Sequence, residues 1–360
     1  MVMADVVVAG GGPAGLAAAI RSAERGLRTM LLERSASVPD KACGEGLMPG
    51  GADELERLGA TIPEGHSAFL RGIRYLQEDG TVLEGQFGGR PGMGIRRTVL
   101  AQALRERASA AGAELRRGTV LAMRPRPDAV EVKTDSGELE ARLLIAADGL
   151  HSPLRRAAGL DLANGSGPMR FGIRRHFALA PWTDFVEVYW ARGIEAYVTP
   201  VGPRTVNVAL LLDRDGSKEF DHLLAPFPAL RERLAGAGFD SELRGAGPLL
   251  QRARARWAER LALVGDAAGY VDAITGQGLS LAFAASSVLM ETMPADLSID
   301  LAPALRRYDE RLRTRWLQYA LPAHALVALS RRPALRRVAL RSVSAIPGAF
   351  GALVRLVAMA

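Results

Sequence analysis

The sequence contains a single cysteine and no long apolar run. Cys43 has no partner for an intrachain disulfide, which fits a protein of a reducing compartment. No stretch reaches the roughly 18 uninterrupted apolar residues of a membrane span. The first residues lead straight into an expected strand. We therefore expect no signal peptide and a cytoplasmic location, with a peripheral position on a membrane as the alternative.

Acidic residues are absent after Glu310. The last fifty residues carry nine arginines, more than the whole net charge of +7, so the rest of the chain is slightly acidic. A basic surface spread over the molecule is therefore not expected, and we predict no nucleic-acid partner.

The basic tail permits two interpretations. Arg336, Arg337 and Arg341 fall on one side of an expected helix, with Leu335 and Val338 on another. Such a helix suits an anionic membrane surface. It equally suits a final helical cap that docks on the protein and keeps its arginines in water. The sequence leaves both open.

A glycine-rich turn follows the first expected strand. Residues 6–8 form a β-branched run, apolar on both faces, which favours a strand in the middle of a sheet. Gly10, Gly12 and Gly15 follow at G-x-G-x-x-G spacing, and residues 13–25 favour a helix that begins with proline. Gly10 permits the tight turn, Gly12 the approach of a pyrophosphate and Gly15 the packing of helix on strand. The helix N-terminus then holds the phosphate charge.

The next expected strand ends in an acidic residue. Glu33 closes residues 29–33 and stands 23 residues after Gly10, where a carboxylate for a ribose is expected. Strand, glycines, helix, strand and acid in this order predict a dinucleotide site. The polar loop 34–49 is long for a plain connection, which favours a functional role.

Three further motifs are separated along the chain. Arg97 begins a helix after a short strand, and alone it is typical of a solvated arginine. One apolar strand ends in Asp148-Gly149, and another ends in Gly265-Asp266 before a helix start. The last motif supplies a carboxylate for a polyol and a second helix N-terminus for negative charge, which suits a reduced flavin.

These motifs, in this order, resemble the FAD-dependent superfamily of p-hydroxybenzoate hydroxylase, the flavin halogenases and the geranylgeranyl reductases. The resemblance implies extended FAD, with NAD(P)H as a transient electron donor. Glu33 would hold the ribose and Arg97 the phosphate region, while the backbone of Val120 would meet the adenine. Asp266 would hold the ribityl chain. The residues expected to contact FAD are Gly10, Gly12, Pro13, Ala14, Gly15, Glu33, Arg34, Cys43, Gly44, Arg97, Val120, Asp148, Gly149, Gly265, Asp266, Gly276, Gly278 and Leu279.

The same resemblance implies an α/β fold. We expect a Rossmann-like FAD-binding domain of the glutathione reductase type, an interleaved and mostly antiparallel β substrate domain, and a C-terminal helical segment. The FAD-binding domain would comprise residues 1–70, 93–165 and 250–300, and the substrate domain 71–92 and 166–249. Residues 301–360 would be helical, with breaks at Pro322, Pro333 and Pro347. Residues 115–124 favour one strand and residues 261–266 another that returns to the first sheet.

Within the superfamily, residues 41–46 and 265–278 look most like the geranylgeranyl-reductase branch, whose Cys-Gly loop lies near the flavin ring. Two positions depart from that branch. Residues 195–200 keep one aromatic residue, Tyr197, of its Tyr-x-Trp-x-Phe-Pro strand, and Ala273 replaces its usual proline. The Trp-x-Trp motif of the halogenases is missing.

The sequence thus predicts an FAD-dependent oxidoreductase of a hydrophobic small molecule, such as an aromatic, polyketide or isoprenoid compound of secondary metabolism. NAD(P)H-dependent monooxygenation is the first interpretation, because no catalytic triad or metal cluster is evident. One alternative is C=C reduction of a prenyl chain, with Cys43 or Glu45 as proton source. The other is a lipid carrier that resembles Rab escort proteins. Cys43 is also typical of a small buried hydrophobe and Glu45 of a solvated acid. His176 and Tyr197 lie where substrate would bind.

Overall fold

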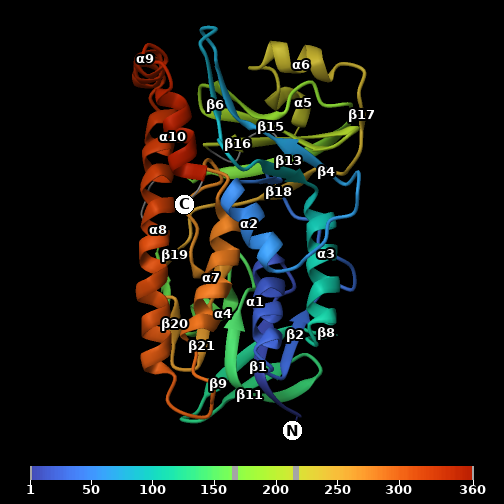
Figure 1. Ribbon diagram of the computed structural model, residues 1–360, viewed down its shortest axis with the longest axis vertical. Helices are drawn as coiled ribbons and strands as arrows, with labels where there is room; N and C mark the ends of the chain where they lie inside the picture. Colours follow the sequence, from blue (N-terminus) through green and yellow to red (C-terminus); the bar gives the residue numbers. More distant parts are fainter. Residues whose placement is uncertain (1, 164–168, 214–218, 359–360) are drawn as a thin grey trace.

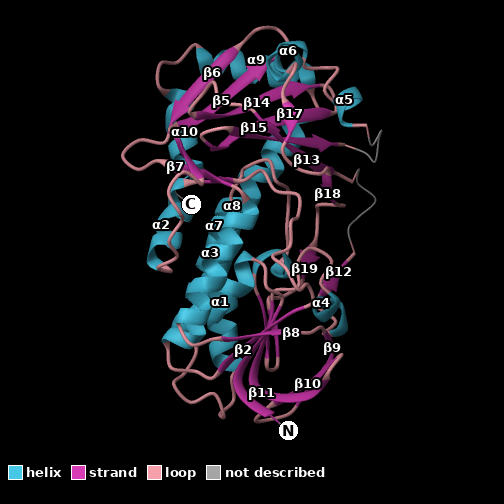
Figure 2. Cartoon of the chain, turned by 90° about the vertical axis from the view of Figure 1, so that its right-hand side faces the viewer, coloured by secondary structure: helices cyan, strands magenta, loops and turns pink. Residues whose placement is uncertain are grey.

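The computed structural model describes residues 2–163, 169–213 and 219–358. The molecule is elongated, with a large sheet at each end and helices between the two sheets (Figures 1 and 2). Segments from both ends of the chain build the lower sheet in Figure 1, and the middle of the chain builds the upper one. The α/β architecture is therefore the one that the sequence predicts.

The first sheet is built around β1 (Val2–Ala9). Val6, Val7 and Val8 are fully buried, as expected of a central strand. The parallel neighbours of β1 are β2 (Thr29–Glu33) and β11 (Gly137–Ala146), and β11 pairs in parallel with β21 (Leu261–Leu263). The other strands are β8 (Glu114–Arg117), β9 (Val120–Pro125), β10 (Val130–Thr134) and β20 (Trp257–Ala258). The carboxyl ends of the parallel strands share one edge, which is where such sheets bind ligands.

Three helices cover one face of this sheet. They are α1 (Pro13–Glu24), α3 (Arg97–Ala110) and α7 (Gly278–Thr292), and α1 contacts both others. Leu16, Leu104 and Phe283 are among the side chains that they bury against the sheet. Helices α1 and α7 come from opposite ends of the chain and lie side by side (Figure 1).

The second sheet has the strand order β17-β13-β16-β15-β14-β5-β6, with β18 beside β13. All its pairings are antiparallel except that of β5 with β14, so the mostly antiparallel prediction is confirmed. The strands are β5 (Gly72–Gln77), β6 (Val82–Gln86), β13 (Phe171–Ala178), β14 (Phe185–Ala191), β15 (Ile194–Gly202), β16 (Thr205–Leu212), β17 (Gly238–Phe239) and β18 (Arg244–Ala246). One face packs against α5 (Phe220–Leu223) and α6 (Pro228–Leu234). The other bears Tyr75, Trp190 and Tyr197.

A small sheet joins the two large ones. It contains β3 (Gly46–Leu47), β4 (Ser67–Leu70) and β7 (Gly92–Ile95), and β4 and β7 both contact β15. Helix α2 (Pro49–Arg57) follows β3 and contacts β7 and α7. The remaining short elements are α4 (Pro153–Ala157), β12 (Asp161–Leu162), β19 (Arg252–Ala253) and the 3₁₀ helix η1 (Gly265–Ala268). This small sheet fixes the end of the loop 34–45 against the second sheet.

The C-terminal segment is helical, but one predicted break is wrong. Helix α8 (Ala302–Ser330) continues through Pro322. Proline costs one backbone hydrogen bond, yet Ala320 and Ala323 pack into the core on either side and hold the turn. Helices α9 (Pro333–Ser344) and α10 (Ala349–Ala358) confirm the other two breaks.

The expected single strand over residues 115–124 is also wrong. The stretch forms two strands, because β8 pairs with β2 and β9 pairs with β10. Gly118 lies between them, and its N–H donates to the Glu33 carbonyl oxygen at 3.0 Å. The local sequence of the two halves does not reveal which strand each of them pairs with.

Arg336 does not lie on an exposed basic side of α9, contrary to both sequence interpretations. It is fully buried, its Nε donates to Gln77 Oε1 at 2.9 Å, and its guanidinium lies 5.4 Å from the centroid of the Trp190 ring. The exposed side of α9 bears Leu335 and Val338, which are 49% and 63% exposed. Helical periodicity cannot show that a distant sheet offers partners to an arginine.

Candidate functional site

The turn between β1 and α1 leaves room for a ligand at one glycine only. Gly10 has φ 110°, and a Cβ there would lie 2.4 Å from the Ala147 carbonyl oxygen. A Cβ on Gly15 would lie 1.9 Å from the Gly10 carbonyl oxygen. Next to Gly12, by contrast, the nearest atom is Arg97 Nη2 at 3.8 Å. Because Gly12 provides no side-chain cap, the first N–H groups of α1 are free to bind an anion.

Glu33 is fixed beside this turn at the carboxyl end of β2. Its Oε2 accepts from the Gly11 N–H at 2.7 Å, and its Oε1 accepts from the Ser35 N–H at 2.9 Å. The carboxylate therefore lies against the glycine turn, as a ribose-binding acid requires. Arg34, directly after it, is exposed. Val120, the residue expected at the adenine, opens β9.

The late motif lies directly against the early one. A Cβ on Gly265 would be 2.5 Å from Cβ of Ala14, so η1 packs on the first turn of α1. From α7, Ser286 Oγ donates to the Ala14 carbonyl oxygen at 3.2 Å. Gly265-Asp266 and the glycine turn thus belong to one site, although 250 residues separate Gly15 from Gly265.

Positive charge gathers between Gly12 and Asp266. Burial raises the pKa of the Asp266 carboxyl, although Arg97 and Lys41 act in the opposite direction. Burial also lowers the pKa of Lys41, with Arg97 in the same direction and Glu33 against it. Lys41 and Asp266 both remain exposed to solvent. Arg97 Nε is buried and has no hydrogen-bond partner among the described residues. The positive charges of Lys41 and Arg97 fit a bound pyrophosphate.

Asp148-Gly149 closes the site from β11. Asp148 Oδ2 accepts from the Leu154 N–H at 3.1 Å, whereas Oδ1 is buried without a partner among the described residues. Burial raises the pKa of this carboxyl. Gly149 has φ 90°, and a Cβ there would be 3.8 Å from Lys41 Nζ. The unpartnered oxygen is available to a hydroxyl group of a ligand.

A buried arginine holds η1 in place. Arg155 Nη1 donates to the carbonyl oxygens of Asp266 and Ala267 at 3.4 and 3.1 Å, and Nε pairs with Asp161 at 2.7 Å. Ser152 caps α4 by accepting from the Arg155 N–H at 2.9 Å. Ser152 and Arg155, which follow Asp148-Gly149 in the chain, thus position Asp266.

The Cys43 loop connects this site to the second sheet. Asn207 Nδ2 on β16 donates to the Cys43 carbonyl oxygen at 2.9 Å, and the Glu45 N–H lies 3.4 Å from Cys43 Sγ. Burial raises the pKa of the Cys43 thiol, although Arg97 acts against this. The thiol is therefore protonated at neutral pH.

Glu45 is not a solvated acid, so that interpretation is wrong. It is buried, with φ 59°. Its Oε1 accepts from the Arg97 N–H at 2.8 Å, and its Oε2 lies 2.5 Å from His176 Nε2. On its other side, His176 Nδ1 lies 2.8 Å from Ser241 Oγ. Glu45 thus ties the Cys43 loop to the start of α3 and to β13.

The two expected substrate residues face different surroundings. His176, Asn207 and Thr199 lie opposite one another on β13, β16 and β15, and this polar row receives the Cys43 loop. Tyr197 lies two residues from Thr199 on the same face of β15, within the apolar cluster, and its hydroxyl is buried without a partner among the described residues. His176 therefore anchors the loop, and Tyr197 lines the apolar side.

The N-terminus of α7 completes the site. Gly276 has φ 66°, and Gly278 and Leu279 begin the helix with no side-chain cap. A Cβ on Gly278 would lie 3.4 Å from Cε2 of Tyr270, whose pKa burial raises well above its ordinary value. Tyr270 lies between this helix start and the apolar face. The uncapped N–H groups suit a group that carries negative charge.

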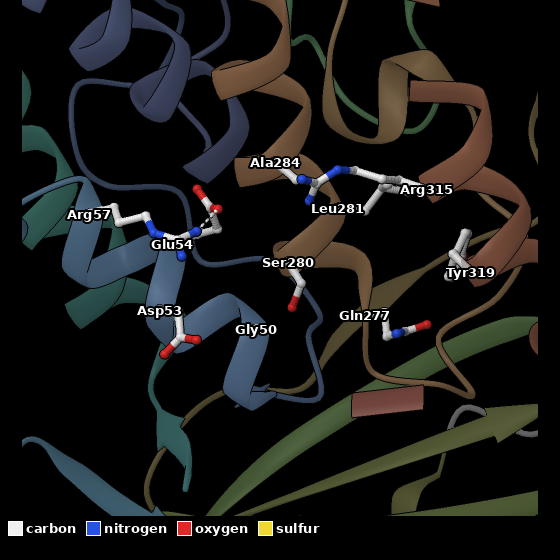
Figure 3. A pocket seen from close by; sticks show the side chains of 10 residues that line it. All are labelled: Gly50, Asp53, Glu54, Arg57, Gln277, Ser280, Leu281, Ala284, Arg315 and Tyr319. Atoms are coloured by element: carbon white, nitrogen blue, oxygen red, sulfur yellow. Dashed lines mark hydrogen bonds and ion pairs between the residues drawn. The ribbon is translucent and has the colours of Figure 1, made fainter. Parts of the chain in front are cut away.

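A separate pocket of about 200 Å³ lies between α2, α7 and α8 (Figure 3). It is lined by Gly50, Asp53, Glu54, Arg57, Gln277, Ser280, Leu281, Ala284, Arg315 and Tyr319. Its volume is below the roughly 300–1,000 Å³ of ordinary ligand pockets, so it does not hold a dinucleotide. No group of three or more His, Cys, Asp or Glu side chains in residues 2–163, 169–213 and 219–358 is arranged to hold a metal ion.

Sequence reasoning missed Lys41, Tyr270 and Arg155 as site residues. Lys41 had a usable signal, because only three of the 46 basic residues are lysines. Arg155 fell within a recognised motif, but its contacts depend on a turn more than a hundred residues away. Tyr270 had no signal beyond its place after Gly265-Asp266.

Comparisons with known proteins agree with this geometry. Residues 3–305 match the FAD binding domain family. The chain is 30% identical over 340 residues to digeranylgeranylglycerophospholipid reductase 1 of Methanopyrus kandleri, a match that covers 85% of each chain. The flavin-dependent brominase Bmp2 superposes with a TM-score of 0.85 at 16% identity, covering 99% of this chain and 94% of that one. A geranylgeranyl bacteriochlorophyll reductase-like protein of Thermoplasma acidophilum gives a TM-score of 0.77 at 21% identity, covering 92% and 88%. The chain therefore belongs to the FAD binding domain family, and it is an FAD-dependent oxidoreductase.

Proposed function

We propose that this protein reduces C=C bonds of an isoprenoid lipid. The observation that carries the proposal is the position of the Cys43 loop, which is hydrogen-bonded to Asn207 on the second sheet and, through Glu45, to the start of α3 beside the dinucleotide site. The similarity to lipid reductases supports it, since the Methanopyrus relative is named a digeranylgeranylglycerophospholipid reductase. Monooxygenation, the first interpretation from the sequence, receives no such support from these names.

The chain's own residues supply the proton side of this reaction. When bound, FAD supplies a carrier of hydride. Reduction of a C=C bond adds a hydride to one carbon and a proton to the other, with NAD(P)H as the proposed source of the electrons. The Cys43 thiol holds a proton, and the positive charge of Arg97 stabilises the thiolate that remains. The thiolate regains its proton from water, while Glu45 and His176 keep the loop in position.

The apolar face provides a surface for a hydrocarbon chain. Tyr75, Trp190 and Tyr197 lie together on it, and the Tyr75 and Trp190 rings are 5.3 Å apart at 71°. Helices α8, α9 and α10 contribute Tyr319, Leu340 and Val354 to the same cluster. The side chains of this cluster already pack on one another, so we propose that an isoprenoid chain lies along its edge beside the Cys43 loop, where the apolar surroundings exclude water from the reacting carbon.

An anaerobic turnover experiment tests the proposal. The FAD-loaded protein is reduced without oxygen and mixed with a digeranylgeranyl glycerophospholipid, and lipid mass and flavin absorbance are followed. We expect flavin reoxidation, with two hydrogen atoms gained per reduced bond. Cys43→Ser should slow reoxidation by about 10²-fold, the lower range of the contribution of a positioned proton donor, without loss of bound FAD. Cys43→Ala, which removes the donor altogether, should slow reoxidation at least as much.

Other outcomes would refute the proposal. In one such outcome the flavin stays reduced in the presence of the lipid but is reoxidised by oxygen. If oxygen is then inserted into an aromatic or polyketide compound, the protein is a monooxygenase. A purified protein that is colourless and takes up no FAD would favour the lipid-carrier interpretation. Unchanged reoxidation in Cys43→Ser would remove Cys43 from the proton path while leaving the reductase assignment intact.

A further inference from the structure

The last three helices and the turn between α9 and α10 carry half of the large apolar side chains that are exposed among the described residues. We name this set the C-terminal face: Leu317, Leu321, Leu335, Val338, Ile346, Leu353 and Leu356. Leu356 is 74% exposed. Helices α8, α9 and α10 contact one another and form one side of the molecule, coloured orange to red in Figure 1. Exposed apolar side chains concentrated on helices that contact one another are typical of a contact surface.

The inner sides of these helices are already engaged, so the exposed residues cannot turn inward. On α10, Val354 packs on β6, where a Cβ on Gly85 would lie 2.7 Å from its Cγ2. The rings of Phe350 and Tyr75 are 5.0 Å apart. The side-chain amide of Gln277 donates to the Val357 carbonyl oxygen. The tail is thus a docked cap whose outer side is apolar.

Arg336 fixes the orientation of α9. Its guanidinium is buried against Trp190 and Gln77, which directs Leu335 and Val338 outward. A helix that only covers the protein would gain more from the opposite orientation, with leucine inside and arginine in water. The observed orientation of α9 therefore favours a binding partner that offers an apolar environment to Leu335 and Val338.

The charge on this side selects the partner. No acidic residue follows Glu310, and Arg332, Arg337 and Arg355 are exposed and form no ion pair within the parts of the chain that the structure describes. A second copy of the same face would bring arginine against arginine, which disfavours self-association. A bilayer with anionic lipids offers both an apolar phase and negative charge.

The geometry favours a helix layer that lies on the bilayer. Among residues 2–163, 169–213 and 219–358, no single helix is long and apolar enough to cross a membrane. Pro333–Ser344 and Ala349–Ala358 reach the required length and composition only as a pair, and they bend by 106° between them. Since α10 also packs on β6, the pair cannot straighten without leaving the protein.

We propose that the C-terminal face docks on the surface of an anionic lipid bilayer. Apolar side chains would enter the interface, and the arginines around them would lie at the level of the lipid phosphates. This inference does not depend on which substrate the site reduces, because no residue of the C-terminal face belongs to the site.

Vesicle sedimentation of the full-length FAD-loaded protein tests it. Vesicles of phosphatidylcholine alone are compared with vesicles that also contain phosphatidylglycerol, at low and at physiological salt. We expect binding to the anionic vesicles, weakened by salt, and little binding to the neutral ones. The double variant Val338→Asp/Leu356→Asp should lower the partition coefficient by about tenfold or more, since it places two charges in the interface.

Matched variants separate this surface from general stickiness. Leu121→Asp removes an apolar residue of similar exposure, 55%, on β9, and should bind vesicles like the wild type. Arg337→Glu should lower anionic binding and leave neutral binding unchanged. Absent binding to anionic vesicles would overturn the proposal. Equal effects of Leu121→Asp and the double variant on vesicle binding would also overturn it. So would a C-terminal face that binds an acidic soluble protein and does not bind the vesicles. Bound FAD and circular dichroism establish that each variant is folded.

Discussion

Replacing Gly12 by alanine separates the cofactor site from the stability of the fold. Gly12 has φ −75° and ψ 173°, a conformation open to any L-residue. Its added Cβ would meet only Arg97 Nη2 at 3.8 Å, an ordinary contact. The free energy of unfolding of the apoprotein should therefore change by less than about 1 kcal/mol, and in the stabilising direction if the reduced freedom of the unfolded chain dominates.

The same methyl group would stand where a pyrophosphate approaches the first turn of α1. A lost hydrogen bond to a charged group costs about 1.5–3 kcal/mol. Because 1.4 kcal/mol corresponds to a factor of ten, the dissociation constant of FAD should rise about 10- to 100-fold. Quenching of flavin fluorescence measures this constant, and urea unfolding of the apoprotein measures stability.

Two glycines provide the controls. Gly89→Ala adds a methyl group to an exposed glycine with no atom within 4 Å, and should change neither quantity. Gly15→Ala would force a Cβ to within 1.9 Å of a backbone oxygen, and should prevent folding. If Gly12→Ala bound FAD as tightly as the wild type, the pyrophosphate would not lie at this turn, and the assignment of the site would be wrong.

Three further predictions concern charged side chains. His176→Leu removes the partner of the buried Glu45 Oε2 and leaves only the Arg97 N–H on Oε1, so the free energy of unfolding should fall by about 3 kcal/mol; equal denaturation midpoints would contradict this. Asp266→Asn should stabilise the apoprotein at neutral pH, yet weaken FAD binding. Burial raises the folded pKa of Asp266 above 3.8, so the folded state binds more protons and stability falls as pH rises through that window; Asp266→Asn should lose this slope in urea titrations. Arg336→Ala should cost about 2 kcal/mol through lost packing and an unpaired Gln77, whereas exposed Arg337→Ala should cost less than about 0.5 kcal/mol.

Much of the dinucleotide site follows from local sequence. The positions of Gly10, Gly12 and Gly15 are set by the turn itself, because strand and helix adjoin directly in the chain. The place of Asp266 could also be predicted. A short apolar strand that ends in Gly-Asp puts the acid at the carboxyl end of the strand, at the edge of the sheet.

Residues whose role depends on distant partners were not predictable in the same way. The burial of Glu45 depends on His176, 131 residues later, and the burial of Arg336 depends on Trp190. Periodicity describes one helix or strand, and it carries no information on which foreign side chain meets a charged group. Pro322 illustrates the same limit, because the packing of its neighbours keeps α8 continuous.

A crystal structure of the protein grown with FAD tests the central claim most directly. The account predicts one extended FAD, with its pyrophosphate at Gly12 and Arg97, its ribityl chain at Asp266 and its ring between Gly278 and Cys43. Electron density for the cofactor away from Asp266, or a ring that lies out of reach of the Cys43 thiol, would contradict it.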